Sequence, residues 1–400
     1  MVATGAFLFA LLLATPDDYL ADAQKALQAN QPAAAEPLLR KAIEADPGDY
    51  FTHFNLALAL SLQHKDAEAI PEFRRTLELK PGLYEADLNL GMLLLRDKQP
   101  ADALPVLKEA SEAKPNEARP QLYYADALLQ TGDAAQAESH YTAALAADPK
   151  SAPAQLGLAR ALFGESKLPA AAEHFRAAGY PDGLLEVAAA YEKAGRADEA
   201  IAIYKEFPAN AAVRQHLGEL ELNNKDALGA IQNLEQAIRT APTTANRLAL
   251  ADAYRMNKQP AKMLEQLQLA AAADPNNYDL RMAWARSLRD NHQIVPAIQQ
   301  FLAATKLKPD SVQGWQELAS LLIVNENYAE GLGALDRLHA LHAEIPGDYF
   351  LRAITLDKMK QNKPALAAYQ QFLAADNGAH PDQEFQARQR VRIIESELKK

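Results

Sequence analysis

Four prolines in the first part of the chain stand at one constant interval. They are Pro47, Pro81, Pro115 and Pro149. A fixed period of about 34 residues, as here, is typical of a solenoid built from repeated units. The period constrains the fold strongly, because every unit must pack against near copies of itself. We therefore expect an extended array of similar elements.

Other residue types keep the same interval. One position holds small residues: Ala23, Ala57, Gly91 and Ala125. A later position holds large residues: Leu39, Phe73, Leu107 and Tyr141. Small side chains let two helix backbones approach closely and a bulky residue fills the adjoining gap, so the pattern predicts pairs of antiparallel helices. The proline ends the second helix of each pair because it lacks a backbone N–H.

This pattern resembles the tetratricopeptide repeat (TPR) family. The matching register returns after an irregular middle, at Pro242, Pro275 and Pro309, and repeats counted from residue 16 to residue 376 number eleven. The resemblance implies an all-α, right-handed α-α superhelix of about eleven helix-turn-helix repeats. It also implies that the first helix of each repeat lines a concave groove where partners bind.

The middle of the chain is too short for the regular period. The equivalent small residues Ala159, Ala188 and Gly218 lie closer together than the prolines do, which predicts two shortened second helices, near residues 178–181 and 207–208. The shortened helices either mark a bend between an N-terminal and a C-terminal half or reflect ordinary variation among repeats. We divide the chain into repeats at 16–180, repeats at 181–380, and a capping helix at 381–400.

The N-terminal residues 1–15 contain an apolar run, residues 6–14, of the length of a signal-peptide core. The run is too short to span a bilayer. No Lys or Arg precedes it, and Leu12 stands where a small residue is usual before cleavage. The run predicts export to the periplasm or the exterior; the alternative is a cytoplasmic protein in which this segment caps the first repeat.

Charge excludes some partners. The chain has a formal net charge of −11, and residues 1–150 hold 13 Lys and Arg against 22 Asp and Glu. An acidic surface repels phosphate, so we expect neither nucleic acid nor an anionic membrane as a partner, and no stable membrane span. The chain has no cysteine, which excludes disulfides and thiolate metal sites.

Catalytic motifs are missing from the sequence. It contains no phosphate-binding Gly-rich loop, no Gly-x-Ser-x-Gly elbow and no His-Glu-x-x-His. The nearest approach to a metal motif is His339 and His342, expected on one helix face, with Glu344. We predict no enzyme, no cofactor and no metal, because the repeats also leave no segment for a catalytic domain.

Candidate groove residues come from the first helices. The apolar candidates are Phe51, Phe54, Leu58, Leu62, Leu88, Met92 and Leu95. They form either an apolar cradle for a peptide or packing between repeats. The charged candidates are Arg119, Arg160, Arg255, Arg286 and Arg289. They either capture a carboxylate or pair with neighbouring aspartates.

The resemblance implies a non-catalytic scaffold or adaptor that binds a protein or peptide partner. The competing hypothesis is an accessory subunit that presents substrate to an enzyme or export machine. Some TPR proteins clamp a chaperone C-terminus with Lys, Asn and Arg side chains. Here Asn55 and Asn89 match one position of that clamp, but Tyr123 stands where an Arg is needed, so the clamp is not supported.

Overall fold

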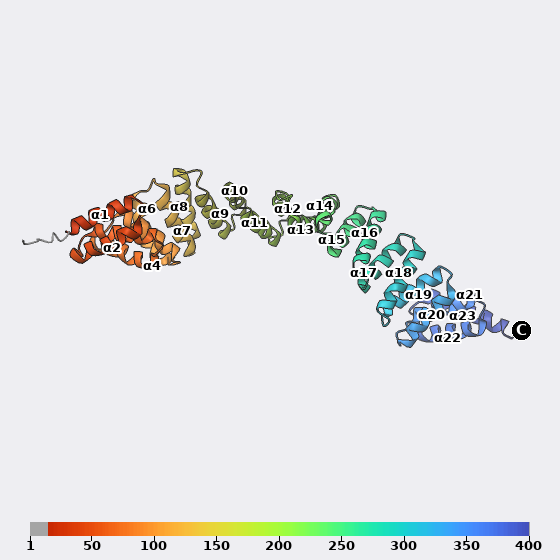
Figure 1. Cartoon of the computed structure of the whole chain (residues 1–400). Coiled ribbons are helices and arrows are strands. Elements are labelled where there is room, and N and C mark those ends of the chain that lie inside the picture. The colour runs from red at the N-terminus through yellow and green to blue at the C-terminus, as the bar shows by residue number, and fades with distance from the viewer. Residues whose placement is uncertain (1–14, 400) are drawn as a thin grey trace, which may run out of the picture. The chain divides into compact units, whose positions relative to one another are not determined.

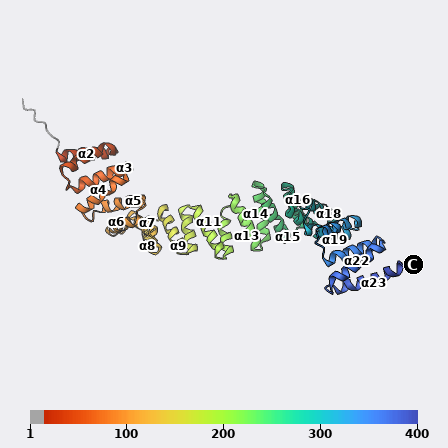
Figure 2. The same ribbon diagram turned by 90° about the horizontal axis from the view of Figure 1, so that it is seen from below.

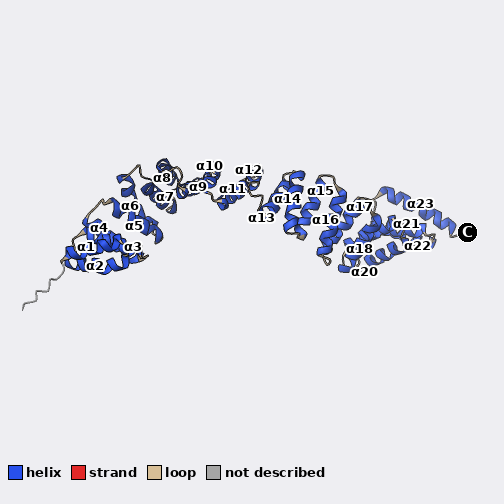
Figure 3. Cartoon of the chain, turned by 45° about the horizontal axis from the view of Figure 1, so that its top comes forward, coloured by secondary structure: helices blue, strands red, loops and turns tan. Residues whose placement is uncertain are grey.

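The computed structural model describes residues 15–399 and forms 23 α-helices there, with no strand in this part of the chain (Figure 1, Figure 3). The predicted all-helical class is confirmed. The chain divides into two compact units, the first ending at Ile203 and the second beginning at Tyr204. The sequence suggested a division earlier, between residues 180 and 181.

The helices of the first unit follow one another with short turns. They are α1 (Pro16–Gln28), α2 (Pro32–Ala45), α3 (Tyr50–Leu62), α4 (Asp66–Leu79), α5 (Tyr84–Arg96), α6 (Pro100–Ala113), α7 (Ala118–Gln130), α8 (Ala134–Ala147), α9 (Ala152–Gly164), α10 (Leu168–Ala178), α11 (Pro181–Lys193) and α12 (Ala197–Tyr204). Figure 2 shows successive helices of this unit lying side by side.

The second unit continues the same alternation. Its helices are α13 (Ala211–Asn223), α14 (Ala227–Thr240), α15 (Thr244–Met256), α16 (Pro260–Ala273), α17 (Tyr278–Asp290), α18 (Ile294–Leu307), α19 (Val312–Val324), α20 (Tyr328–Ala340), α21 (Pro346–Lys358), α22 (Asn362–Asp376) and α23 (Pro381–Glu397). In chain order, the first 22 helices of the described residues make eleven consecutive pairs, as the proline period predicted. Odd-numbered helices up to α21 are therefore the first helices of the repeats, and even-numbered helices up to α22 are the second helices.

The two helices of a pair cross where one side chain is small. Ala57 in α3 and Ala125 in α7 are fully buried, as are the large Phe73 in α4 and Leu107 in α6. At Gly91 in α5 even one added Cβ would overlap the side chain of Leu107. The alternation of small and large residues thus forms the core between the helices of each pair.

Each turn inside a repeat contains one residue with positive φ. The eleven residues are Asn30, His64, Lys98, Gly132, Ser166, Gly195, Lys225, Lys258, His292, Glu326 and Lys360. Nine of them are not glycine, and their φ angles lie between 56° and 63°. Left-handed backbone is costly for such residues, so the packing of the two helices holds each turn in this conformation.

Two second helices are shortened, as the sequence predicted. α10 has 11 residues and α12 has 8, whereas α4 and α6 each have 14. Gly179 ends α10 in the left-handed conformation at φ 65°. The boundary between the two units falls within the second shortened helix.

The last helix, α23, packs on α22 and covers the end of the second unit. Ala387 and Ile394 are fully buried against the cluster that contains Phe372. Phe385 is 65% exposed and Leu398 is 41% exposed, so these two apolar residues face outward. The helix hides the open apolar end of the last repeat, which every solenoid must cover.

Candidate functional site

Three consecutive first helices of the first unit, α3, α5 and α7, enclose a pocket of about 390 Å³. We call this surface the first-helix face. The pocket is lined by Ser61, Asn89, Met92, Leu93, Leu95, Arg96, Tyr123, Asp126 and Gln130. Its volume lies in the range of protein sites that hold small ligands or a few peptide side chains.

The lining residues follow the register of the repeats. Leu58, Met92, Asp126 and Arg160 occupy one position of four successive first helices. The register places them in a row, because each repeat presents the same helix face as the one before. The row is apolar at α3 and α5 and charged at α7 and α9, so the face changes character along the first unit.

The charged groups of the face are largely held by their own repeat neighbours. Arg96 pairs with Asp66 of the preceding repeat, and the Tyr141 hydroxyl donates to Asp126 at 2.6 Å. Burial raises the pKa of the Asp126 carboxyl, while the hydrogen bond from Tyr141 and the charge of Arg160 oppose that rise. Burial, together with the nearby Asp126 carboxylate, also raises the pKa of Tyr141.

Two lining side chains have no hydrogen-bond partner among the described residues, namely the Tyr123 hydroxyl and the Gln130 amide. Asn89 donates to the backbone oxygen of Glu85 at 2.6 Å. The pocket therefore combines the apolar Met92 and Leu95 with polar groups that are free to bond a peptide backbone.

The predicted apolar residues fall into three classes of exposure. Phe51 and Leu62 are 40% and 51% exposed. The half-buried ones are Phe54, Leu58, Met92 and Leu95. Phe54 packs edge-to-face on the buried Phe73, with ring centroids 5.7 Å apart, so it also belongs to the core of its repeat.

Leu88 requires a correction. It is only 5% exposed and is therefore unavailable to a ligand. The reason is that α5 packs against α4, α6 and α7, so that most of its first two turns are covered. Leu88 thus packs between helices, which was the alternative to a peptide-binding role for the apolar candidates.

The predicted arginines do not form one site. In the first unit, Arg119 and Arg160 are exposed; a guanidinium nitrogen of Arg119 lies 3.4 Å from the sulfur of Met92, and Arg160 lies over the ring of Tyr180. Arg255, in the second unit, pairs with Asp252 at 3.1 Å. Each arginine thus has its own local contact.

Arg286 and Arg289 both pair with Glu317 of the next repeat. Arg289 also pairs with Asp290 at 3.0 Å. The two guanidinium groups are therefore not free to capture a ligand's carboxylate in this structure, because the chain's own Glu317 pairs with both. The expected aspartate partner is found only for Arg289, which pairs with Asp290.

Sequence reasoning missed Gln130 and Ser61 and treated Tyr123 only as a defect in a clamp. The signal for Gln130 was available, because it stands at the same repeat position as Leu62 and Arg96. Ser61 stands at the repeat position of Leu95, and Tyr123 at that of Asn89, so the register also pointed to them. Only the packing of α3, α5 and α7 shows that these groups meet at one pocket and that the Tyr123 hydroxyl has no partner there.

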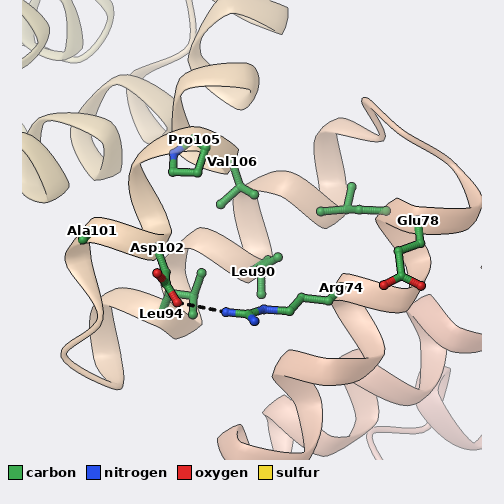
Figure 4. A pocket seen from close by; sticks show the side chains of 9 residues that line it. Arg74, Glu78, Leu90, Leu94, Ala101, Asp102, Pro105 and Val106 are labelled. Carbon is green, nitrogen blue, oxygen red and sulfur yellow. Dashed lines mark hydrogen bonds and ion pairs between the residues drawn. The ribbon is translucent and has the colours of Figure 1, made fainter.

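The opposite side of α5 borders a second pocket, of about 570 Å³, between the second helices α4 and α6 (Figure 4). We call it the outer pocket. Arg74 and Asp102 pair across one end of it at 3.0 Å. Leu77, Leu90 and Val106 form its apolar wall.

The expected pair of imidazoles on one helix is wrong. α20 ends at Ala340, and His342 lies in the following turn with φ 52°. His339 contacts Glu344 at 2.6 Å. Among residues 15–399, no three His, Cys, Asp or Glu side chains gather as a metal would require.

None of the helices formed by residues 15–399 is both long and apolar enough to cross a bilayer. The apolar run at residues 6–14 lies outside the described residues, and so does the cleavage expected after it.

One family model, described as a tetratricopeptide repeat, matches residues 20–84 and 124–183, and a second of the same description matches residues 94–139. No curated protein matches the chain.

Among solved structures, MamA (41-end) from Desulfovibrio magneticus RS-1 is 24% identical, covering 41% of this chain and 92% of that chain with a TM-score of 0.39. YrrB, described as a TPR protein with an unusual peptide-binding site, is 22% identical, covering 40% of this chain and 83% of that chain, also with a TM-score of 0.39.

Proposed function

The chain belongs to the tetratricopeptide-repeat family, and from this premise we propose that it is a non-catalytic scaffold that binds a segment of a partner protein on the first-helix face. The observation that carries the proposal is the pocket shared by α3, α5 and α7. It joins apolar surface from Met92 and Leu95 to the unpaired polar groups of Tyr123 and Gln130.

This combination suits a peptide. The apolar walls bury a partner's aliphatic or aromatic side chain, and burial of such a side chain contributes about 1.5 to 3 kcal/mol. The free amide and hydroxyl groups satisfy the polar backbone that enters with it, which avoids the cost of leaving those groups unpaired. Exposed Phe51 and Leu62 lie on α3, at the edge of the same face, and extend the apolar surface.

A peptide library tests the proposal. Random peptides would be selected for binding to the full chain, and the affinity of the best binder measured by fluorescence anisotropy. We expect Leu95→Glu to weaken that binding at least tenfold, because the carboxylate must be desolvated against the apolar wall.

The matched control is Leu228→Glu. Leu228 is 68% exposed in the second unit, so the same substitution there should leave both folding and peptide affinity unchanged. Circular dichroism would verify that Leu95→Glu keeps its helices. Equal affinities of wild type and a folded Leu95→Glu variant would refute the first-helix face as the binding site.

We further propose that the protein acts outside the cytoplasm. The apolar run at residues 6–14 supports this. Mass spectrometry of the protein isolated from source cells would give its mature N-terminus. A chain that starts just after residue 14 supports export, whereas a chain that retains residues 1–14 and fractionates with cytosol contradicts it.

A further inference from the structure

Among the described residues, five of the repeats are joined to the turn before them by the same hydrogen bond. The fourth residue of the first helix reaches the carbonyl oxygen of the proline that ends the preceding repeat. His53 Nε2 lies 3.2 Å from the Pro47 oxygen, and Trp315 donates to Pro309 at 2.8 Å. The same contact is made by Gln121 to Pro115, Gln155 to Pro149 and Arg281 to Pro275.

Most of these residues make a second bond to a side chain at one fixed position of the second helix of the same repeat. Gln121 Oε1 lies 2.7 Å from His140 Nδ1, and Arg281 donates to Gln300 at 3.0 Å. Each such residue thus supplies a donor to the proline carbonyl and links its first helix to the preceding turn.

The third repeat lies between two repeats that make this bond, but it has Asp87 at the equivalent position. Asp87 occupies the position that His53 holds one repeat earlier and Gln121 one repeat later. A carboxylate cannot donate, and in the described chain no side chain donates to the Pro81 carbonyl. Asp87 is only 5% exposed and has no hydrogen-bond partner, and the residue at its partner position on α6 is Val106. The Asp87 carboxylate and the Pro81 carbonyl therefore both lack a side-chain donor from the described part of the chain.

A second carboxylate faces the same place. Glu109 of α6 is exposed and has no ion pair among the described residues. Burial raises the pKa of Asp87 to about 6, and the charge of Glu109 adds to the rise. Arg74, the cation among the residues that line the outer pocket, pairs with Asp102 at 3.0 Å.

The outer pocket is lined by neighbours of Asp87, although neither Asp87 nor Glu109 is itself among its lining residues. Leu90 and Leu94 follow Asp87 by one and two helical turns, on the same face of α5, and both line the pocket. Leu77 and Val106 complete an apolar wall. Figure 4 shows Leu90, Leu94 and Val106 beside the pair of Arg74 and Asp102. A long basic side chain suits such a surface, because its methylene stem packs on apolar groups while its charged head reaches the carboxylates.

We propose that the outer pocket binds a Lys or Arg side chain from a basic segment of a partner protein. The cationic head supplies the missing donors to Asp87 and Glu109, and its stem lies on Leu90 and Val106. The surrounding charge favours such a partner, since residues 1–150 hold 22 acidic against 13 basic residues. This site is independent of the first-helix face, because the second helices α4 and α6 form its sides.

The test compares variants of the full chain for binding to a fluorescein-labelled, amidated octalysine peptide, measured by anisotropy in EDTA. Asp87→Gln installs the donor residue that Gln121 and Gln155 provide in the next two repeats. We expect this variant to bind the peptide at least tenfold more weakly and to melt at a higher temperature than the wild type. Glu109→Gln should also weaken binding.

The matched control is Glu112→Gln, which removes the same charge from an exposed position of α6. It should change the affinity less than twofold. An equal loss in Glu112→Gln and Asp87→Gln would mean diffuse attraction to an acidic surface and would overturn the site. So would unchanged binding in Asp87→Gln, a melting temperature lowered by it, or a wild type that does not bind octalysine.

Discussion

The fourth residue of each first helix illustrates how single side chains connect the repeats. Where that residue is His53, Gln121 or Trp315, it bonds to the carbonyl of the preceding proline. Asp87 at the same position has no such bond and is buried. A charge buried without a partner destabilises the folded state. We therefore expect the third repeat to be less stable than the repeats before and after it.

The pH dependence of stability should reveal this cost. Burial raises the pKa of Asp87 from 3.8 to about 6, with Glu109 adding to the rise. Well below pH 4 the carboxyl is protonated in both folded and unfolded chains and costs nothing. As the pH rises from 4 to 6 the unfolded chain releases this proton first, so folding stability falls, and above pH 6 the loss is complete at about 2 to 3 kcal/mol.

We therefore expect Asp87→Asn to match the wild type closely in urea unfolding at pH 4 and to be more stable by about 2 kcal/mol at pH 7. Acidic groups distant from Asp87 have the same surroundings in both proteins, so their contributions to the free energy of unfolding cancel in the difference. A stability difference that does not change between pH 4 and pH 7 would show that Asp87 does not titrate in this window.

At the scale of helices, close approach decides which small residues are exchangeable. Gly157 in α9 faces the ring of Tyr141 in α8, and an added Cβ would overlap that ring. Gly164, the last residue of the same helix, has no atom within 4 Å of the equivalent position. The two glycines look alike in the sequence but differ completely in surroundings.

Gly157→Ala should lower the free energy of unfolding by about 1 to 3 kcal/mol, because overpacking must displace Tyr141 from Asp126. Gly164→Ala is the matched control in the same helix. It should be neutral or stabilise by up to about 1 kcal/mol, since alanine favours the helix and meets no neighbour. Thermal and urea unfolding of the two variants compare them directly, and a stabilising Gly157→Ala would contradict the packing described for α8 and α9.

At the scale of the whole molecule, each repeat depends on its immediate neighbours. α23 covers the end of the second unit with Ala387 and Ile394, and Arg390 donates twice to Asp357 of α21, at 2.6 Å each. In a solenoid, a perturbation at one end decays over neighbouring repeats. Stability at the C-terminal end should therefore depend on α23, whereas stability near α1 should not.

Deleting residues 381–400 should abolish amide-exchange protection in α21 and α22 while leaving α1 to α4 protected as in the full chain. The reason is that the deletion exposes the cluster around Phe372, whose buried members lie in α21, α22 and α23. Phe385→Ser is the control, because that side chain is 65% exposed and should not affect exchange. Uniform loss of protection along the chain would mean that the array unfolds as one cooperative body.

The period of prolines and small residues was enough to predict the all-helical class, eleven helix pairs and the two shortened helices, because these follow from local chain chemistry repeated at constant spacing. Contacts between repeats needed the tertiary structure. The sequence did not reveal that Leu88 is buried, that Glu317 holds both Arg286 and Arg289, or that Asp87 lacks a donor. Each of these depends on residues from different helices meeting at one place, and a linear period specifies which residues are equivalent but not which of them touch.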